Sequence, residues 1–117
     1  MTTAPDPDCL FCKIVAGDIP AEMVSEAEHT VAFRDVNPQA PTHVLVIPRR
    51  HEPDIGSLAA ADADATIALL AEARSIAEAQ GNGSYRLVFN TGADAHQTVF
   101  HCHAHVLAGR SMGWPPG

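Results

Sequence analysis

One short run constrains the fold more than any other segment, because it alternates histidine with small or apolar residues. A period of two is the period of a β-strand, and the run predicts a strand over 99–107. Alternate residues of a strand lie about 6.5 to 7 Å apart, so three imidazoles on one face can surround one tetrahedral phosphate. The histidines emerge on one face, and the residues between them pack inward, in the run His101-Cys102-His103-Ala104-His105-Val106-Leu107.

Three neighbouring imidazoles suit chemistry at phosphorus. Their ordinary pKa of about 6.5 lets neighbouring copies be neutral or protonated near neutral pH. A neutral copy can attack phosphorus through one nitrogen if a carbonyl group holds its other N–H, and a second copy can protonate the leaving group. This chemistry needs no metal ion. Two alternatives stay open for the run: coincidental histidines on an exposed strand, and a surface metal site.

Apolar patterning and turn residues predict the other elements. We expect a short helix over 9–16, a hairpin from 23–24 and 29–34, and a strand over 43–47 that stops at Pro48. One long helix is expected over 62–80, followed by a strand over 85–90. The order favours an α+β fold, an antiparallel sheet of about five strands with one long and one short helix on one face. Residues 1–8 are predicted to be a flexible tail and 9–117 a single domain.

Composition excludes several classes of protein. The 117 residues are 46% hydrophobic, which is enough for one core. The net charge of -7 argues against a nucleic-acid partner, because such binding neutralises phosphates with Lys and Arg. No apolar stretch approaches the roughly 18 residues of a membrane span, and the start of the chain lacks the pattern of a signal peptide. We therefore expect no membrane partner and a cytoplasmic location.

The run of histidines resembles the signature of the histidine-triad (HIT) superfamily. Two further segments, 33–43 and the ending 109–117 with Trp-Pro-Pro-Gly, are similar to the HINT-like branch of nucleoside phosphoramidases. This resemblance implies a homodimer that cleaves the P–N bond of purine nucleoside 5′-phosphoramidates through a covalent nucleotidyl-histidine. A dinucleoside polyphosphate hydrolase is the closest alternative. A regulatory module that binds a nucleotide or a metal, with incidental catalysis, is an alternative of another class.

The resemblance also implies roles for particular residues. His103 is the expected nucleophile, and His105 assists the leaving group and the phosphoryl oxygens. Thr98 and Asn90 bond to the same oxygens, and Asp35 accepts both ribose hydroxyls, which suits a carboxylate with two acceptor oxygens. An apolar slot for the purine comprises Leu10, Phe11, Ile14, Phe33 and Val36. Trp114 is expected near the active sites of the dimer, where it affects which leaving groups fit.

Two places depart from the family pattern. The loop 92–98, Gly-Ala-Asp-Ala-His-Gln-Thr, stands where the branch is richer in glycine, so His96 adds bulk and a titratable ring beside the phosphate. Substrate preference is expected to shift there. Cys102 and Ala104 replace larger apolar residues, which changes packing more than chemistry.

A pair of cysteines two residues apart indicates a metal site. Zinc favours two thiolates completed by two imidazoles in a closed tetrahedron, but a CxxC pair alone is a weak signal. The resemblance implies that His51 and His101, the first histidine of the run, complete the site. The expected cofactor is a structural zinc ion held by Cys9, Cys12, His51 and His101. Two buried free thiols without metal are the alternative.

Overall fold

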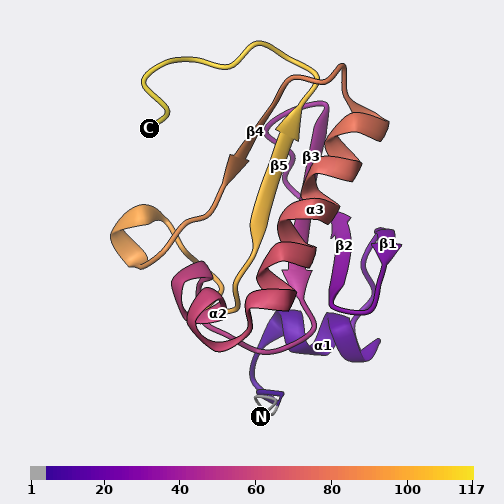
Figure 1. The fold of residues 1–117 in the computed structure, drawn as a ribbon, viewed down its shortest axis with the longest axis vertical. Coiled ribbons are helices and arrows are strands. Elements are labelled where there is room, and N and C mark those ends of the chain that lie inside the picture. Colours follow the sequence, from indigo (N-terminus) through magenta and orange to yellow (C-terminus); the bar gives the residue numbers. More distant parts are fainter. Residues whose placement is uncertain (1–4) are drawn as a thin grey trace.

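The computed structural model describes residues 5–117, which form a five-stranded antiparallel sheet with helices on both faces (Figure 1). The strands lie in the order β1-β2-β3-β5-β4, so β5 is hydrogen-bonded between β3 and β4. This arrangement confirms the predicted α+β class. The elements are α1 (Leu10–Ala16), β1 (Met23–Glu26), β2 (Thr30–Arg34), β3 (Thr42–Pro48), α2 (Ile55–Ala61), α3 (Ala63–Gln80), β4 (Tyr85–Val88), the 3-10 helix η1 (Ala93–Ala95) and β5 (Ala104–Ala108).

The two faces of the sheet are covered by different helices. In β3 the side chains alternate: Val44 and Val46 pack in one cluster with α2 and α3, while Leu45 and Ile47 pack in another with Phe11 of α1. The expectation that both helices share one face is therefore wrong. It failed because α1 is short, and its buried residues contact the sheet opposite α3.

A third helix, α2, was not predicted. Asp54 begins it by accepting the N–H of Ser57 at 2.8 Å, and Asp62 caps α3 in the same way by accepting the N–H of Ala65 at 3.0 Å. Leu58 is the one buried residue of α2. A helix with a single buried position leaves almost no periodic signal in the sequence.

The strand β5 is shorter than the predicted strand over 99–107. The ladder with β3 ends at the pair Val46↔Ala104, and the ladder with β4 ends at Val88↔His105. Beyond these pairs the carbonyl oxygen of Pro48 lies 2.9 Å from Nε2 of His101, so a side chain takes the place of a ladder bond. Two of the three histidines, His101 and His103, therefore stand on an irregular segment before β5.

The remaining features concern the ends and surface of the chain. Asp6 anchors a turn, in which the N–H groups of Asp8 and Cys9 donate to its Oδ1 and its carbonyl oxygen. The predicted flexible tail falls outside the described residues at 1–4.

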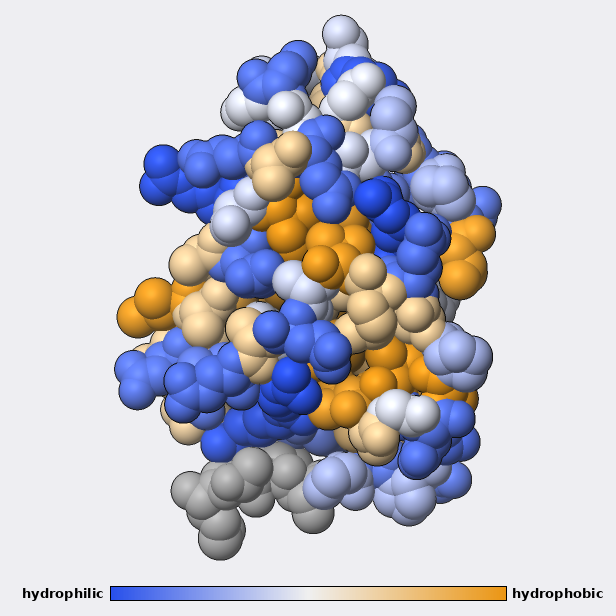
Figure 2. All heavy atoms as spheres, turned by 90° about the vertical axis from the view of Figure 1, so that its right-hand side faces the viewer, coloured by the Kyte–Doolittle hydropathy of each residue, from blue (hydrophilic) through white to orange (hydrophobic). Residues whose placement is uncertain are grey.

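Hydrophilic and hydrophobic residues mix in small groups over the side that carries β1 (Figure 2). Within 5–117, no helix is long and apolar enough to cross a membrane.

Candidate active site and metal centre

Two adjoining cavities meet at a common wall formed by Asp35, Thr98, His103 and His105. The first, called here the apolar cavity, measures about 380 Å³ and lies among α1, the end of β2 and the segment before β5. The second, the polar cavity, measures about 510 Å³. Its remaining lining residues are Asn37, Gln39, His43, Asn90 and His96. One elongated ligand can thus place an apolar part and a polar part on either side of the histidines.

The apolar cavity contains every residue predicted for the purine slot. Phe11 and Phe33 are buried and meet edge to face with ring centroids 5.5 Å apart. Leu10 and Val36 are exposed at the rim, where a ligand can cover them. The residues predicted for this slot and found in its lining are Leu10, Phe11, Ile14, Phe33 and Val36.

The ring of His103 is oriented by a peptide carbonyl. Its Nδ1 lies 2.8 Å from the carbonyl oxygen of His101, which can only accept, so Nδ1 carries the ring proton. The other nitrogen, Nε2, therefore keeps its lone pair. The ring packs edge to face on Phe11 at 5.1 Å, and burial lowers the pKa of His103. A neutral imidazole with one unprotonated nitrogen is the form that a nucleophile needs.

His105 is oriented by a fourth histidine that the sequence analysis missed. The backbone N–H of Gln39 donates to Nδ1 of His43 at 3.0 Å, so the proton of His43 lies on Nε2. That N–H lies 2.9 Å from Nδ1 of His105, which must accept and leave its own proton on Nε2. His43 is the second residue of β3 and the one histidine in that strand, and its register opposite Leu107 brings it to the site.

Burial keeps both of these imidazoles neutral. It lowers the pKa of His105 to about 4, with further lowering by His103 and His43 and an opposing effect of Asp35. It also lowers the pKa of His43, again opposed by Asp35. Oδ1 of Asp35 accepts the N–H of Asn37 at 2.8 Å, and Oδ2 lies 3.5 Å from Nε2 of His43. The result is a connected chain of proton-carrying groups along one wall of the polar cavity.

The four predicted metal ligands form a compact donor set. Sγ of Cys12 lies 3.2 Å from Nδ1 of His51 and 3.6 Å from Nδ1 of His101, and the two ring nitrogens lie 3.2 Å apart. Tetrahedral zinc with ordinary bond lengths separates sulfur from nitrogen by about 3.6 Å and two nitrogens by about 3.3 Å. The remaining ligand, Cys9, has its Sγ 3.4 Å from Nδ1 of His101.

The protonation state of His101 also suits a metal. Its Nε2–H donates to the carbonyl of Pro48 at 2.9 Å, which leaves the Nδ1 lone pair facing the thiols. Burial lowers the pKa of His101 to about 4 and raises the pKa of Cys12. Metal binding therefore has to displace the thiol protons but not a ring proton. The donor set fits a structural zinc ion, as the sequence analysis predicted.

A second cluster of potential ligands, formed by Asp35, His43 and His105, fails the same test. Because Gln39 donates to Nδ1 of His43, the nitrogen that faces the cluster carries a proton and offers no lone pair. This cluster is a hydrogen-bonded chain and not a metal site.

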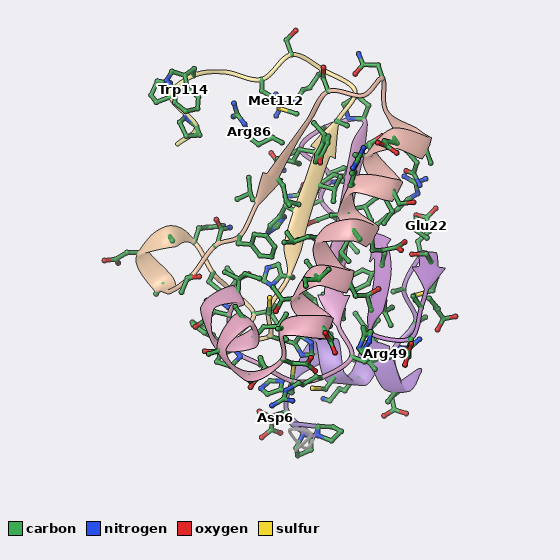
Figure 3. All side chains as sticks on the ribbon, in the orientation of Figure 1. Asp6, Glu22, Arg49, Arg86, Met112 and Trp114 are labelled. Atoms are coloured by element: carbon green, nitrogen blue, oxygen red, sulfur yellow. The ribbon has the colours of Figure 1, made fainter. Side chains whose placement is uncertain are left out.

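Three other predicted site residues differ in their placement. Thr98 lies in the common wall, and Asn90 lines the polar cavity. Trp114 is 83% exposed and lines neither cavity of its own chain. It lies at the opposite end of the long axis from Asp6 (Figure 3). The described chain alone therefore does not bring Trp114 to the other site residues.

The fold and the site define the class of this protein. An antiparallel sheet presents alternating histidines beside two joined cavities, and a family model described as "HIT domain" matches residues 16–112. The chain belongs to the HIT family.

Named relatives agree with this assignment. An uncharacterised HIT-like protein from Synechocystis sp. is 46% identical over 111 residues, which cover 94% of this chain and 97% of that protein. A 14 kDa zinc-binding protein from Zea mays is 43% identical over 115 residues, covering 96% of this chain and 90% of that protein. The crystal structure of a HIT family hydrolase from Legionella pneumophila Philadelphia 1 is similar with a TM-score of 0.89 and 46% identity, covering 94% of this chain and 100% of that one.

Proposed function

We propose that this chain hydrolyses the P–N bond of purine nucleoside 5′-phosphoramidates in two displacements at His103. The observation that carries the proposal is the protonation pattern of the site. A carbonyl holds Nδ1–H of His103 and frees Nε2 for attack, while His43 holds His105 with its proton on Nε2. The nucleophile and the proton carrier therefore stand side by side, with ring centroids 5.1 Å apart.

In the first displacement, Nε2 of His103 forms a bond to phosphorus and the P–N bond breaks. The negative phosphate favours protonation of His105, which then carries a proton on both Nδ1 and Nε2, while the Nε2–H of His43 turns to the carboxylate of Asp35, 3.5 Å away. His105 passes its Nε2 proton to the leaving nitrogen, which departs as a neutral amine. The nucleoside monophosphate is now attached to His103.

In the second displacement, a water molecule attacks phosphorus and loses a proton to the pair His105 and His43. The bond from phosphorus to Nε2 of His103 breaks, which restores the neutral imidazole and releases the nucleoside monophosphate. Thr98, on the common wall, and Asn90 supply hydrogen bonds to the phosphoryl oxygens. The base occupies the apolar cavity, and Asp35 accepts the ribose hydroxyls.

The test is a His103→Ala variant assayed with adenosine 5′-phosphoramidate. Turnover is expected to fall on the order of a thousandfold or more, because no other group forms the covalent bond. Calorimetry with AMP should show that binding persists. Rapid quenching of the parent should give a nucleotidyl adduct on the peptide that contains His103, and His29→Ala serves as the control histidine. Turnover at the parental rate in His103→Ala contradicts the mechanism and favours a binding module.

The lining of the polar cavity favours a phosphoramidate substrate over the alternative, a dinucleoside polyphosphate. Among the described residues that line it, none is Lys or Arg. A polyphosphate leaving group carries several negative charges, which proteins usually match with such side chains or a metal ion. Higher kcat/KM for diadenosine polyphosphates than for phosphoramidates is the result that contradicts this choice.

We further propose that the four-ligand cluster holds zinc with a structural role. The donor geometry supports this, and a Zea mays relative is named a zinc-binding protein. Zinc would supply no reaction step and would tie α1 to the segment before β5. Protein purified without chelators should contain about one zinc per chain by elemental analysis. Cys12→Ser should lose the metal, and Cys102→Ala should keep it because Cys102 lies in the other core cluster. A zinc-free parent contradicts the proposal.

The proposed assembly is a homodimer. The strand β4 is an edge of the described sheet, and an unpaired edge is a surface on which another strand can pair. Because Trp114 lies outside the cavities of its own chain, its predicted role at a leaving-group site requires that a second chain supply it. Analytical ultracentrifugation at micromolar concentration is expected to give the mass of two chains, and a monomer contradicts the dimer.

A further inference from the structure

His96 has an unusual backbone conformation. It follows η1 with φ 67° and ψ 32°, and it is the one residue other than glycine with positive φ among residues 5–117. Left-handed backbone disfavours side chains, and glycine is the residue that adopts it without strain. The loop 92–98 therefore places a large side chain where the backbone favours none.

The loop is held firmly enough to keep this conformation. Gln97 is buried, and its Oε1 accepts the N–H of Gly92 at 2.9 Å. Its Nε2 donates to the carbonyls of Pro53 at 2.6 Å and Val99 at 3.1 Å. Strained residues persist where surrounding contacts fix them, and they cluster at ligand-binding sites. The position of His96 relative to the common wall is thus set by the fold.

The ring of His96 belongs to the polar cavity. It lines that cavity together with Asn37, Gln39 and Asn90, none of which lines the apolar cavity. It is near enough to His105 for its charge to lower the pKa of His105. His96 is exposed, whereas the other three histidines of this lining are mostly buried.

The charges around the cavity give His96 a particular importance. The chain has a net charge of -7, and the carboxylate in the common wall, Asp35, is also negative. Described lining residues of the polar cavity include neither Lys nor Arg. An imidazole offers an N–H donor in either protonation state, and a neighbouring anion favours its charged form. His96 is therefore an exposed N–H donor of the polar cavity, and no Lys or Arg among the described lining residues competes with it for an anionic group.

We propose that His96 is a specificity-determining residue that binds a carboxylate carried by the leaving amine, so that the preferred substrates are nucleoside monophosphates joined to the amino group of an amino acid. This inference rests on the proposed function, because it places the nucleoside in the apolar cavity and the amine in the polar one. A single imidazole flanked by neutral amides matches the one negative charge of a carboxylate. The neutral donors of Asn37 and Asn90 can complete its hydrogen bonds.

The experiment compares two substrates that differ by one charge: AMP joined to glycine and AMP joined to glycine methyl ester. The parent is expected to prefer the free carboxylate by about tenfold in kcat/KM, the effect of one charge-assisted hydrogen bond. His96→Asn and His96→Gly both tolerate left-handed backbone and remove the ring. In both variants the ratio of kcat/KM for the free carboxylate to kcat/KM for the methyl ester should fall close to one. His29→Asn, which removes a histidine that lines neither cavity, should keep the parental preference.

A second measurement separates recognition from turnover. Non-hydrolysable adenosine 5′-carbamates of the same two amines are titrated by calorimetry into the parent and into His96→Asn. A carboxylate preference in Kd that disappears in His96→Asn supports the inference, even if neither phosphoramidate is hydrolysed and the proposed function fails. Equal affinity of the parent for the two carbamates overturns it. A preference that survives in His96→Asn and His96→Gly overturns it as well.

Discussion

At the scale of single residues, the histidines of the site differ in what orients each ring. His103 and His101 donate to backbone carbonyls, whereas His105 accepts from a side chain, that of His43. His43 itself is fixed by the backbone N–H of Gln39. The protonated nitrogen of each ring follows from its partner, and identical residue types thus perform different tasks.

The hydrogen bonds that join Gln39 to His43 and His43 to His105 predict the effect of changing His43. His43→Ala should lower kcat about tenfold to a hundredfold, because His105 loses the N–H that fixes its orientation and proton. KM should change much less, since the proposed role of His43 is to hold His105 and not to bind the substrate. His43→Gln, which can also donate an N–H, should recover part of kcat. Steady-state kinetics with adenosine 5′-phosphoramidate tests this, and an equal loss in both variants indicates a packing role instead.

The alternation of the histidine run was informative because it is a local pattern, and it singled out His103 and His105, which line both cavities, and His101, which lies in the cluster of metal donors. His43 gave no such signal. It is a lone histidine in an apolar strand. It reaches the site because β3 pairs with β5, which brings His43 to His105, 62 residues further along the chain. Register between distant strands is not visible in one sequence.

At the scale of elements, α3 supports the sheet beneath the site. It buries Leu69, Ala73, Ile76 and Ala77 against one face of the sheet, where Cys102, Ala104 and Val106 also pack. The histidines point to the opposite face. The segment that carries the histidines thus lies between α3 on one face of the sheet and α1 on the other.

This packing makes a prediction about two neighbouring leucines of α3. Leu69 is fully buried, so Leu69→Ala should reduce the free energy of unfolding by about 2 to 5 kcal/mol through lost burial and a cavity. Leu70 is 43% exposed, and Leu70→Ala should cost less than about 1 kcal/mol. Urea denaturation followed by circular dichroism measures both values. Similar losses in the two variants contradict the assigned burial.

Elements were predictable where apolar residues recur at helical spacing or form a run bounded by turn residues. The long helix α3 shows the first pattern and the strands β2, β3 and β4 the second, and the structure confirms these elements. The helix α2 was missed because Leu58 is its one buried residue. The face of the sheet predicted for α1 was wrong because the apolar pattern of so short a helix does not specify the element against which it packs. The start of β5 was misplaced because the alternating sequence pattern continues beyond the last ladder pair, into a segment with bends at 99–101.

At the scale of the whole molecule, buried neutral histidines connect folding to pH. The pKa of His105 is about 4 and that of His43 is lowered, both by burial, whereas an unfolded histidine titrates near pH 6.5. Between these values the unfolded chain binds more protons than the folded one. Stability is therefore complete above about pH 6.5 and falls as the pH drops toward 4.

Chemical denaturation at several pH values tests this dependence. The free energy of unfolding should decrease steadily between pH 7 and pH 4.5, and a His105→Asn variant should show a smaller decrease. Both proteins should be measured with the same zinc content, because metal ligands also bind protons. A parent whose stability is constant over this range contradicts the inferred neutral state of the two rings.

Position 101 contributes to two functions through different parts of one residue. Its ring faces the thiols, while its peptide carbonyl holds the proton of His103. Every amino acid carries that carbonyl, so a substitution at 101 removes a metal ligand without deleting the acceptor. The metal centre and the proposed nucleophile are in this sense separable by mutation, so a HIT chain can gain or lose the zinc ligand at this position while the ring of the proposed nucleophile keeps its orientation.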